Sequence, residues 1–271
     1  MNEPALSPKR ARYLHRLRQE SRRVRLWQAA LFVGFFAFWE LSCRVGLSDG
    51  FLVSSPSRIA ATFLSLCRSG DVLLHVGVSC WETAVGFLLG TAAGTVVAVA
   101  MWWWPTLSRV LDPYLVVLNA LPKTALGPIF IVWMGAGTGA IIVMTLAISL
   151  IVTILNMYEG FRATDAQKTR LMAAMGASRW QLLRMLVFPA NYATLLNTLK
   201  VNVGLSWVGV IMGEFLVSRA GLGYLIVYGS QVFNMDLVMT SVLLLLVAAV
   251  VMYRLVLWVE KILYHLLGVK A

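Results

Sequence analysis

Hydrophobic residues fall into six long stretches along the chain, separated by shorter polar segments. A helix of about 20 apolar residues crosses a hydrocarbon core of roughly 30 Å, and each stretch is close to that length. The predicted spans are residues 26–43, 76–104, 111–134, 139–158, 195–215 and 237–258. The third span contains Pro122 and Pro128, which can divide it into two half-helices. The pattern predicts an all-α membrane protein with six transmembrane helices.

The composition agrees with this prediction. Of the 271 residues, 59% are hydrophobic and 13% are charged, whereas an ordinary soluble domain has about 25% charged residues. A soluble enzyme of this size needs more polar surface than such a chain supplies. Cys43, Cys67 and Cys80 share no metal-ligand spacing, and the three histidines stand in unrelated regions. We therefore predict no catalytic set and no metal site.

The positive charge is unevenly distributed between the segments that connect the spans. The net charge is +11, and Lys and Arg gather in the segments that a six-span topology places on the same side as both termini. These residues are Lys9, Arg10, Arg12, Arg16, Arg18, Arg22, Arg23, Arg25, Arg109, Arg162, Lys168, Arg170, Arg179, Arg184, Lys261 and Lys270. The other side receives Arg58, Arg68 and Arg219, with Arg44 at the border. Because positive loops stay in the cytoplasm, both termini are predicted to be cytoplasmic, and no nucleic-acid partner is needed to explain the charge.

Three regions follow from this topology. Residues 1–25 form a basic cytoplasmic tail, residues 26–260 form the transmembrane domain, and residues 261–271 form a cytoplasmic C-terminal tail. The N-terminal tail either orients the first span or lies as an amphipathic helix on anionic lipid.

Residues 159–190 are too long for a simple connection, since most connections have about 4–6 residues. Thr164 or Asp165 is an N-cap for a first short helix, and Thr164 with Gln167 has the capping-box spacing. Gly176 is a helix C-terminus. The connection is therefore predicted to begin with its own helix.

A second short helix follows in the same connection. Ser178 with Gln181 forms another capping box, and Pro189 ends the helix. Both helices are amphipathic, so their apolar faces must contact the membrane, the spans or a partner. Basic residues among them offer charge complementarity to a partner. The alternative is an interfacial re-entrant segment without a partner.

This segment resembles the cytoplasmic signature of the inner-membrane permease subunits of binding-protein-dependent ABC transporters. The signature has a glycine followed thirteen positions later by a proline, as Gly176 and Pro189 are, and Gly176–Arg179 reads Gly-Ala-Ser-Arg as is common in that family. Its aliphatic positions fall on Leu186 and Phe188. The chain departs from the signature at residues 170–172, which read Arg-Leu-Met where Glu-Ala-Ala is usual.

The resemblance extends from about Phe51 to Trp258 and is strongest to the nitrate/sulfonate/taurine branch. Other segments that resemble the family are residues 52–57, 86–90, 121–135, 213–214 and 221–224. Glu82 stands near a position where that branch usually has a basic residue.

The resemblance implies that the two short helices are coupling helices that dock on an ABC ATPase subunit. The residues implied in coupling are Asp165, Arg170, Met172, Ala173, Gly176, Ala177, Ser178, Arg179, Trp180 and Pro189. The chain has no Gly-x-x-x-x-Gly-Lys-Ser/Thr loop, so we expect no cofactor here and ATP–Mg only on the partner ATPase. The chain itself is expected not to be an enzyme.

Polar groups in the spans suggest a pathway. Asn119, Pro122 and Lys123 lie at the break in the third span, and broken helices at membrane depth often line a pathway. We predict that these residues, with Trp207 and Glu214 in the fifth span, border the substrate pathway or gate. The alternative is that Lys123 snorkels or pairs with an acid.

Glycines recur at four-residue spacing in two of the predicted spans. Gly86, Gly90 and Gly94 repeat in the second span, and Gly209 and Gly213 in the fifth. Small residues at this spacing allow close helix packing, here expected within one subunit rather than at a dimer seam.

Six spans seldom enclose a pathway alone, so a permease homodimer in the bacterial inner membrane is expected. The resemblance also implies an extracytoplasmic substrate-binding protein and import of a small solute, such as a sulfonate- or nitrate-like anion. A vitamin precursor such as a thiamine pyrimidine is the alternative substrate. A gradient-driven secondary transporter is the rival class, which would need paired acids or bases at mid-membrane.

Overall fold

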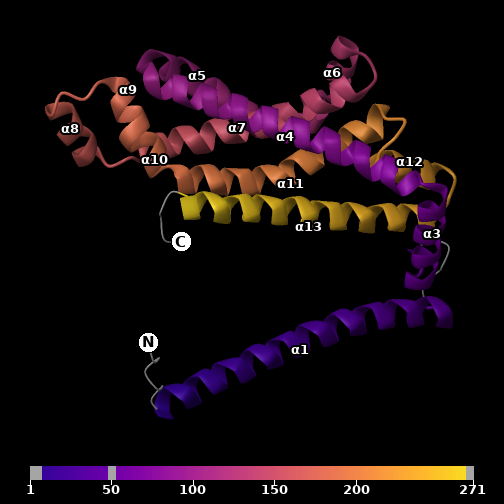
Figure 1. Ribbon diagram of the computed structural model, residues 1–271. Helices are drawn as coiled ribbons and strands as arrows, with labels where there is room; N and C mark the ends of the chain where they lie inside the picture. The colour runs from indigo at the N-terminus through magenta and orange to yellow at the C-terminus, as the bar shows by residue number, and fades with distance from the viewer. Residues whose placement is uncertain (1–7, 48–52, 267–271) are drawn as a thin grey trace. The chain divides into compact units, whose positions relative to one another are not determined.

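The structure, a computed structural model, describes residues 8–47 and 53–266, and these residues form helices joined by short connections (Figure 1). By its internal contacts the chain divides into two units, Met1–Thr62 and Phe63–Ala271.

The first unit holds α1 (Pro8–Val45) and the start of α3 (Pro56–Ser69). The Glu40 carboxylate accepts the backbone N–H of Ser57 at 3.1 Å and its hydroxyl at 2.9 Å, so it caps the N-terminus of α3. The predicted motif at residues 52–57 is therefore anchored to the end of α1, although Leu52 lies outside the described residues. Residues 8–25, predicted as a tail, are helical and continue directly into the first span. Residues 1–7 are outside the described part.

The second unit contains the remaining helices. They are α4 (Asp71–Trp103), α5 (Pro105–Ala120), η1 (Lys123–Leu126), α6 (Gly127–Met134), α7 (Thr138–Arg162), α8 (Ala166–Ala174), α9 (Arg179–Leu182), η2 (Leu183–Val187), α10 (Phe188–Ala190), α11 (Tyr192–Val217), α12 (Leu222–Gln231) and α13 (Met235–Leu266).

Helices α4 and α7 pack closely along a seam of small residues. Gly86, Gly90 and Gly94 of α4 face, in the same order, three hydroxyl residues of α7, namely Thr145, Ser149 and Thr153. A side chain at any of the three glycines would overlap its partner. The predicted packing of these glycines within one chain is confirmed, and the shared order shows that α4 and α7 run parallel.

Helix α11 packs antiparallel against both. Gly209 lies over Thr145, and Gly213 lies over Ile141. Near the other end of α11, Asn202 donates hydrogen bonds to the hydroxyls of Thr91 at 2.9 Å and Thr153 at 2.7 Å. The three helices thus form the centre of the bundle, and the Asn202 amide joins all three through its hydrogen bonds.

The parallel packing of α4 and α7 shows how many times the chain crosses the bundle. Five helices are long and apolar enough to cross a membrane, and Pro105–Ala120 with Lys123–Met134 forms a bent pair with an angle of 92°. Because α4 and α7 run in the same direction, the chain between them must return across the thickness of the bundle. The bent pair makes this return, as Figure 1 shows for α5 and α6, and it is therefore the third of six spans.

The bent span differs in detail from the prediction. It begins at Pro105 rather than near residue 111, because a proline is well accommodated in the first turn of a helix. Its break lies at Leu121 and Pro122, as predicted, but Pro128 sits in the first turn of α6 and breaks nothing. The helices α3 and α12 were not predicted, since neither is long enough to stand out as a span. Helix α13 runs to Leu266, into the predicted C-terminal tail, whose residues 267–271 are outside the described part.

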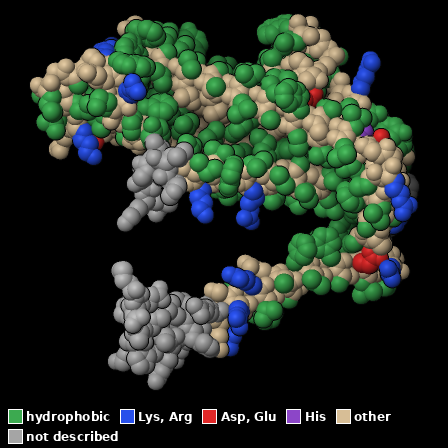
Figure 2. All heavy atoms as spheres, in the orientation of Figure 1, with side chains coloured by type: hydrophobic (Ala, Val, Ile, Leu, Met, Phe, Trp, Pro, Cys, Tyr) green, Lys and Arg blue, Asp and Glu red, His purple; other side chains and the backbone are tan. Residues whose placement is uncertain are grey.

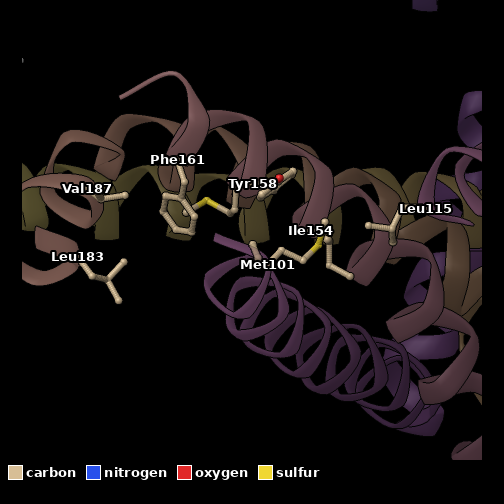
Figure 3. Close-up of a cluster of buried hydrophobic side chains, with 9 residues drawn as sticks. Met101, Leu115, Ile154, Tyr158, Phe161, Leu183 and Val187 are labelled. Carbon is tan, nitrogen blue, oxygen red and sulfur yellow. The ribbon is translucent and has the colours of Figure 1, made fainter. Parts of the chain in front are cut away.

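A cluster of buried apolar side chains closes one end of the bundle. It joins Met101 of α4, Leu115 of α5 and Phe161 of α7 with Leu183 and Val187 of η2 (Figure 3). The segment after α7 therefore packs on three of the spans through hydrophobic contacts and is not a free loop.

Candidate functional site

The connection between α7 and α11 begins with a capped helix at one end of the bundle. Asp165 is the N-cap of α8: its Oδ1 accepts the backbone N–H of Gln167 at 2.8 Å and of Lys168 at 3.4 Å. Of the two caps left open by the sequence, the structure selects Asp165. Thr164 instead accepts a hydrogen bond from the amide of Asn191 at 3.0 Å, which ties the two ends of the connection together.

Helix α8 ends in a left-handed turn at Gly176. This glycine has a φ of +83°, a conformation that other residues rarely adopt. The N–H of Gly176 donates to the carbonyl of Ala173, and the N–H of Ala177 donates to that of Met172, both at 3.0 Å. This is the Schellman arrangement, in which backbone groups close the helix end. The predicted helix stop at Gly176 is confirmed.

The second helix starts immediately after this turn. The Ser178 hydroxyl accepts the N–H of Gln181 at 3.3 Å, and the Gln181 side chain accepts the N–H of Ser178 at 2.8 Å, forming the predicted capping box. The helical course continues through the wide turn η2 and one residue past Pro189, to Ala190. The wider hydrogen-bonding pattern of η2 accommodates the proline, which has no N–H to donate.

The connection is also joined to the spans by a polar contact. The Arg179 guanidinium donates to the main-chain carbonyl of Trp103, the last residue of α4, at 2.8 Å. The rings of Trp103 and Trp180 lie 6.5 Å apart. Together with the apolar contacts of Leu183 and Val187, these interactions fix α9 and η2 to the ends of α4 and α7.

The outer side of the connection is both apolar and basic. Four large apolar side chains are 60–78% exposed there, namely Leu171, Met175, Trp180 and Met185. Lys168, Arg170, Arg179 and Arg184 are exposed among them, and Figure 2 shows Lys and Arg side chains at this end of the helices. We call the eight residues the coupling surface. Of the other residues predicted in coupling, Asp165, Ala173, Gly176 and Ser178 are exposed, while Met172, Ala177 and Pro189 are half-buried.

The second predicted site lies at the bend of the third span. The Lys123 ammonium donates to the main-chain carbonyl of Asn119 at 3.0 Å and to its side-chain oxygen at 3.3 Å. Carbonyls at the end of a helix have no partner within the helix, so Lys123 caps α5 where Pro122 interrupts it. The hydrogen bonds of Lys123 in the described residues thus go to an amide residue, not to an acid.

The bend lies nearer the end of the bundle opposite the coupling surface. Gly127, at the start of α6, contacts Met144 of α7 and Leu216 of α11. Met144 is in the second turn of α7, which begins at Thr138, and Leu216 is in the last turn of α11.

The structure does not bring Trp207 and Glu214 to this bend. Trp207 is buried in an apolar cluster with Phe87, Val203 and Ala248, toward α13. The Glu214 side chain is 2% exposed and lies at the end of the bundle opposite the coupling surface. In the described arrangement both residues pack helices together.

Glu214 belongs to a buried polar network that holds the start of α12 against α4. It accepts the Ser79 hydroxyl at 2.5 Å and the N–H of Gly223. Ser79 in turn accepts the N–H of Leu222 at 2.7 Å, and His75 Nδ1 accepts the N–H of Gly221 at 3.0 Å.

Sequence reasoning missed this network. The one available signal was the spacing of His75, Ser79 and Glu82, which places three polar residues on one face of an apolar helix.

Comparison with known proteins agrees with this architecture. Residues 86–267 match the family described as the binding-protein-dependent transport system inner membrane component. The aliphatic sulfonates transport permease protein SsuC of Bacillus subtilis is 26% identical over 195 residues, which cover 72% of this chain and 71% of the relative. The formylaminopyrimidine transport permease protein ThiX of Halalkalibacterium halodurans is 28% identical, covering 71% and 76%. The taurine transport system permease protein TauC of Escherichia coli is 23% identical, covering 84% and 85%.

The fold is also found in a solved transporter. A chain of the MetNI methionine ABC transporter in an inward-facing conformation superposes with a TM-score of 0.60, at 20% sequence identity, over 73% of this chain and 95% of that chain. The six helical spans, the capped connection and the family match over about two thirds of the sequence agree. The chain belongs to the binding-protein-dependent transport system inner membrane components: it is a multi-pass membrane permease of an ABC importer.

Proposed function

We propose that the coupling surface docks on a separate ABC ATPase subunit and transmits its movement to the spans. The observation that carries this proposal is the rigidity of an exposed connection. Its apolar side chains face outward, while caps at Asp165, Gly176 and Ser178 fix both helices and Arg179 fixes them to α4. An amphipathic element that is exposed yet rigid is suited to a protein partner and to rigid-body coupling.

Contacts of α9 and η2 with α4 and α7 can transmit a movement of the coupling surface to the proposed pathway. A shift of α9 acts on the end of α4 through the Arg179 bond, and on the end of α7 through Leu183 and Val187. Helices α4 and α7 share a close seam, so they move together. The bend near Asn119 and Lys123 packs on the second turn of α7 through Gly127, and it is the proposed gate of the substrate pathway.

The proposed assembly is two copies of this chain, two ATPase subunits and an extracytoplasmic substrate-binding protein. The second copy is proposed because a single set of six spans seldom encloses a pathway. We propose that the coupling surface and both termini are cytoplasmic, because the basic residues of the sequence gather in these segments. The ATP–Mg cofactor would be held by the ATPase subunits alone.

The proposed substrate is a small anion of the sulfonate or nitrate class. The relatives named for aliphatic sulfonates and taurine support it, and so does a lysine at the bend. A pyrimidine vitamin precursor is the alternative, which the relative named for formylaminopyrimidine supports. Uptake of taurine and of formylaminopyrimidine by vesicles that contain the complete transporter separates the two. Uptake of the pyrimidine alone would contradict the anion proposal.

Co-purification tests the docking surface. Expressed with the ABC ATPase subunit encoded nearest to it, the chain should retain that subunit in detergent. Met175→Glu should release it, because Met175 is 78% exposed on the coupling surface and a charge there prevents apolar contact. The control is Leu73→Glu, since Leu73 is 82% exposed on α4, at the far end of the bundle. A Met175→Glu complex as stable as the control would refute the docking assignment.

The gate is tested separately with Lys123→Met. Loss of one interaction worth about 1.4 kcal/mol in the rate-limiting step lowers the transport rate about tenfold. The control is Lys261→Met, an exposed lysine near the end of α13. Unchanged substrate affinity and turnover in Lys123→Met would remove Lys123 from the mechanism.

A further inference from the structure

Two carboxyl groups lie together at the buried end of the bundle, opposite the coupling surface. Glu82 of α4 is 1% exposed and Glu214 of α11 is 2% exposed. The Ser79 hydroxyl of α4 binds Glu214, and Glu82 lies one turn further along the same face of α4, so the two carboxyl groups are neighbours. Two negative charges in one buried site repel each other strongly. The stability of this site therefore depends on how many protons the two carboxyl groups bind.

Hydrogen-bond donors surround the Glu214 carboxyl group. Fixed donors point at both of its oxygens: the Ser79 hydroxyl at Oε1 and the N–H of Gly223 at Oε2. Gly223 lies in the first turn of α12, a helix of ten residues, where the helix dipole also favours a negative charge. A carboxylate that accepts hydrogen bonds from such donors is stabilised, whereas protonation of an oxygen would remove an acceptor that these donors use.

The surroundings of Glu82 favour its neutral form. Its Oε2 is fully buried and has no hydrogen-bond partner among the described residues. An ionised oxygen in this position would lack every donor it needs. A protonated oxygen, in contrast, becomes a donor, and the Glu214 carboxylate is the acceptor beside it.

We propose that Glu82 and Glu214 form a proton-binding site, in which Glu82 is a carboxylic acid that shares its single proton with the Glu214 carboxylate. The site binds a proton rather than a metal ion, because a metal needs several oxygen or nitrogen ligands. Within the part of the chain that the structure describes, no group of three or more His, Cys, Asp or Glu side chains is arranged to hold a metal. Most of the other groups around Glu214 are donors, which repel a cation.

The neighbouring titratable groups leave the proton with this pair. His75 accepts the N–H of Gly221 through Nδ1, so it is a neutral imidazole with its proton on Nε2. The interaction of Asp71 with His75 is electrostatic, and so is the interaction of the Cys80 thiol with Glu214. None of the three is a hydrogen-bond partner of Glu82 in the contacts above.

The proton holds three helices together at this end. With it, α4 and α11 are bridged through the two carboxyl groups, and Glu214 remains in place to bind the start of α12. When the pair releases its proton to solvent at alkaline pH, two buried negative charges face each other, and this end of the bundle loosens. The site does not depend on the transported solute or on the ATPase.

Infrared spectroscopy of the purified chain tests the proton directly. At neutral pH the wild type should show the carbonyl stretching band of a protonated carboxylic acid, and the band should shift in D₂O. Glu82→Gln should remove the band but keep the fold, because the amide is neutral and can donate to Glu214. The matched control is Glu260→Gln, since Glu260 is ion-paired with Lys200 at 2.8 Å and should be ionised. A wild type without the band, or a Glu82→Gln variant that retains it, would overturn the proposal.

Thermal unfolding in detergent gives a second readout. The unfolding temperature of the wild type and of Glu260→Gln should fall from neutral to alkaline pH, and that of Glu82→Gln should fall clearly less. Parallel curves for all three proteins would contradict the shared proton. A rise in the unfolding temperature of the wild type with added Na⁺, K⁺ or Ca²⁺ over choline, absent in Glu82→Gln, would assign the site to a metal cation instead.

Discussion

The two ends of the helix bundle are built in different ways. At the coupling end, the caps at Asp165, Gly176 and Ser178 form hydrogen bonds with residues two or three positions away, and most side chains between them are exposed. At the opposite end, His75 and Ser79 bind main-chain groups 143–146 positions away, and every side chain involved is buried. Local bonds shape a surface that faces outward, whereas long-range bonds lock helices to one another.

The two ends should therefore respond differently to substitution. The buried polar network contributes to the stability of the bundle, whereas the coupling surface is exposed and available to a partner. A change at the buried end should destabilise the whole bundle, because it leaves polar groups without partners in the interior. A change at the coupling end should leave the bundle folded and alter only what the surface does, because its groups can be hydrated instead.

The largest effect is expected from an alanine at a glycine of the buried end. Gly221 has a φ of +120° and lies so close to the Glu214 carboxyl group that a Cβ would overlap it. Gly221→Ala should therefore cost about 3 kcal/mol of stability, from backbone strain and from displacement of Glu214. The unfolding temperature in detergent measures the loss.

Gly176→Ala is the matched control at the coupling end. Gly176 also has a positive φ, of +83°, but no atom lies within 4 Å of the position of a Cβ. Its substitution should cost about 1 kcal/mol. If the two variants unfold at the same temperature, the contrast between the ends is wrong.

An intermediate effect is expected from Ser79→Ala. The Ser79 hydroxyl donates to Glu214 and accepts the N–H of Leu222, so its removal leaves two buried groups without a partner. Hydrogen bonds between membrane helices are worth about 0.6 kcal/mol on average and at most about 1.7 kcal/mol, so the loss should be about 2 kcal/mol. Ser230→Ala, on the exposed side of α12, is the control and should unfold as the wild type does. A loss of equal size in both variants would place the stability outside the network.

The same contrast explains what could be predicted from the sequence. The spans and the caps of the coupling segment follow from hydrophobic runs and from residues a few positions apart, so their positions could be predicted closely. The sequence also predicts six spans, but only a long-range contact, the parallel packing of Gly86, Gly90 and Gly94 against α7, shows that the bent pair is one of them. The glycine spacing predicts close packing but does not identify the partner helix.

The hydrogen-bond partners of Glu214 could not be predicted for the same reason. Its partners Ser79 and Gly223 come from two other elements, and no local pattern distinguishes a pathway residue from a residue that caps a helix. The burial of Trp207 with Phe87, Val203 and Ala248 likewise depends on residues from other helices. An ionisable or amphipathic side chain in a span indicates that it contacts another polar group or helix. The sequence does not identify that contact, and the packing of the helices does.

A smaller and local effect is expected from Ser178→Ala. Loss of an N-cap costs about 1 kcal/mol, and here it should loosen only the start of α9. Hydrogen–deuterium exchange should accelerate at Arg179–Leu182 and remain unchanged in α4 and α11. The unfolding temperature should not move, because this capped turn is not part of the buried network. Faster exchange throughout the bundle would show that the two ends are not separate.

The smallest effect on stability is expected from Arg179→Met. Its hydrogen bond to the Trp103 carbonyl lies at an exposed position, so water can replace it at a cost of about 0.5 kcal/mol. If this bond transmits force, however, the assembled transporter should still bind its ATPase subunit and hydrolyse ATP, while less solute is transported for each ATP. Arg184→Met is the control, because Arg184 is an exposed arginine of the same surface and should affect docking alone. A change in docking without a change in the ratio of transport to hydrolysis would make Arg179 an ordinary contact residue. A change in the ratio alone would show that coupling depends on one bond that contributes almost nothing to the stability of the fold.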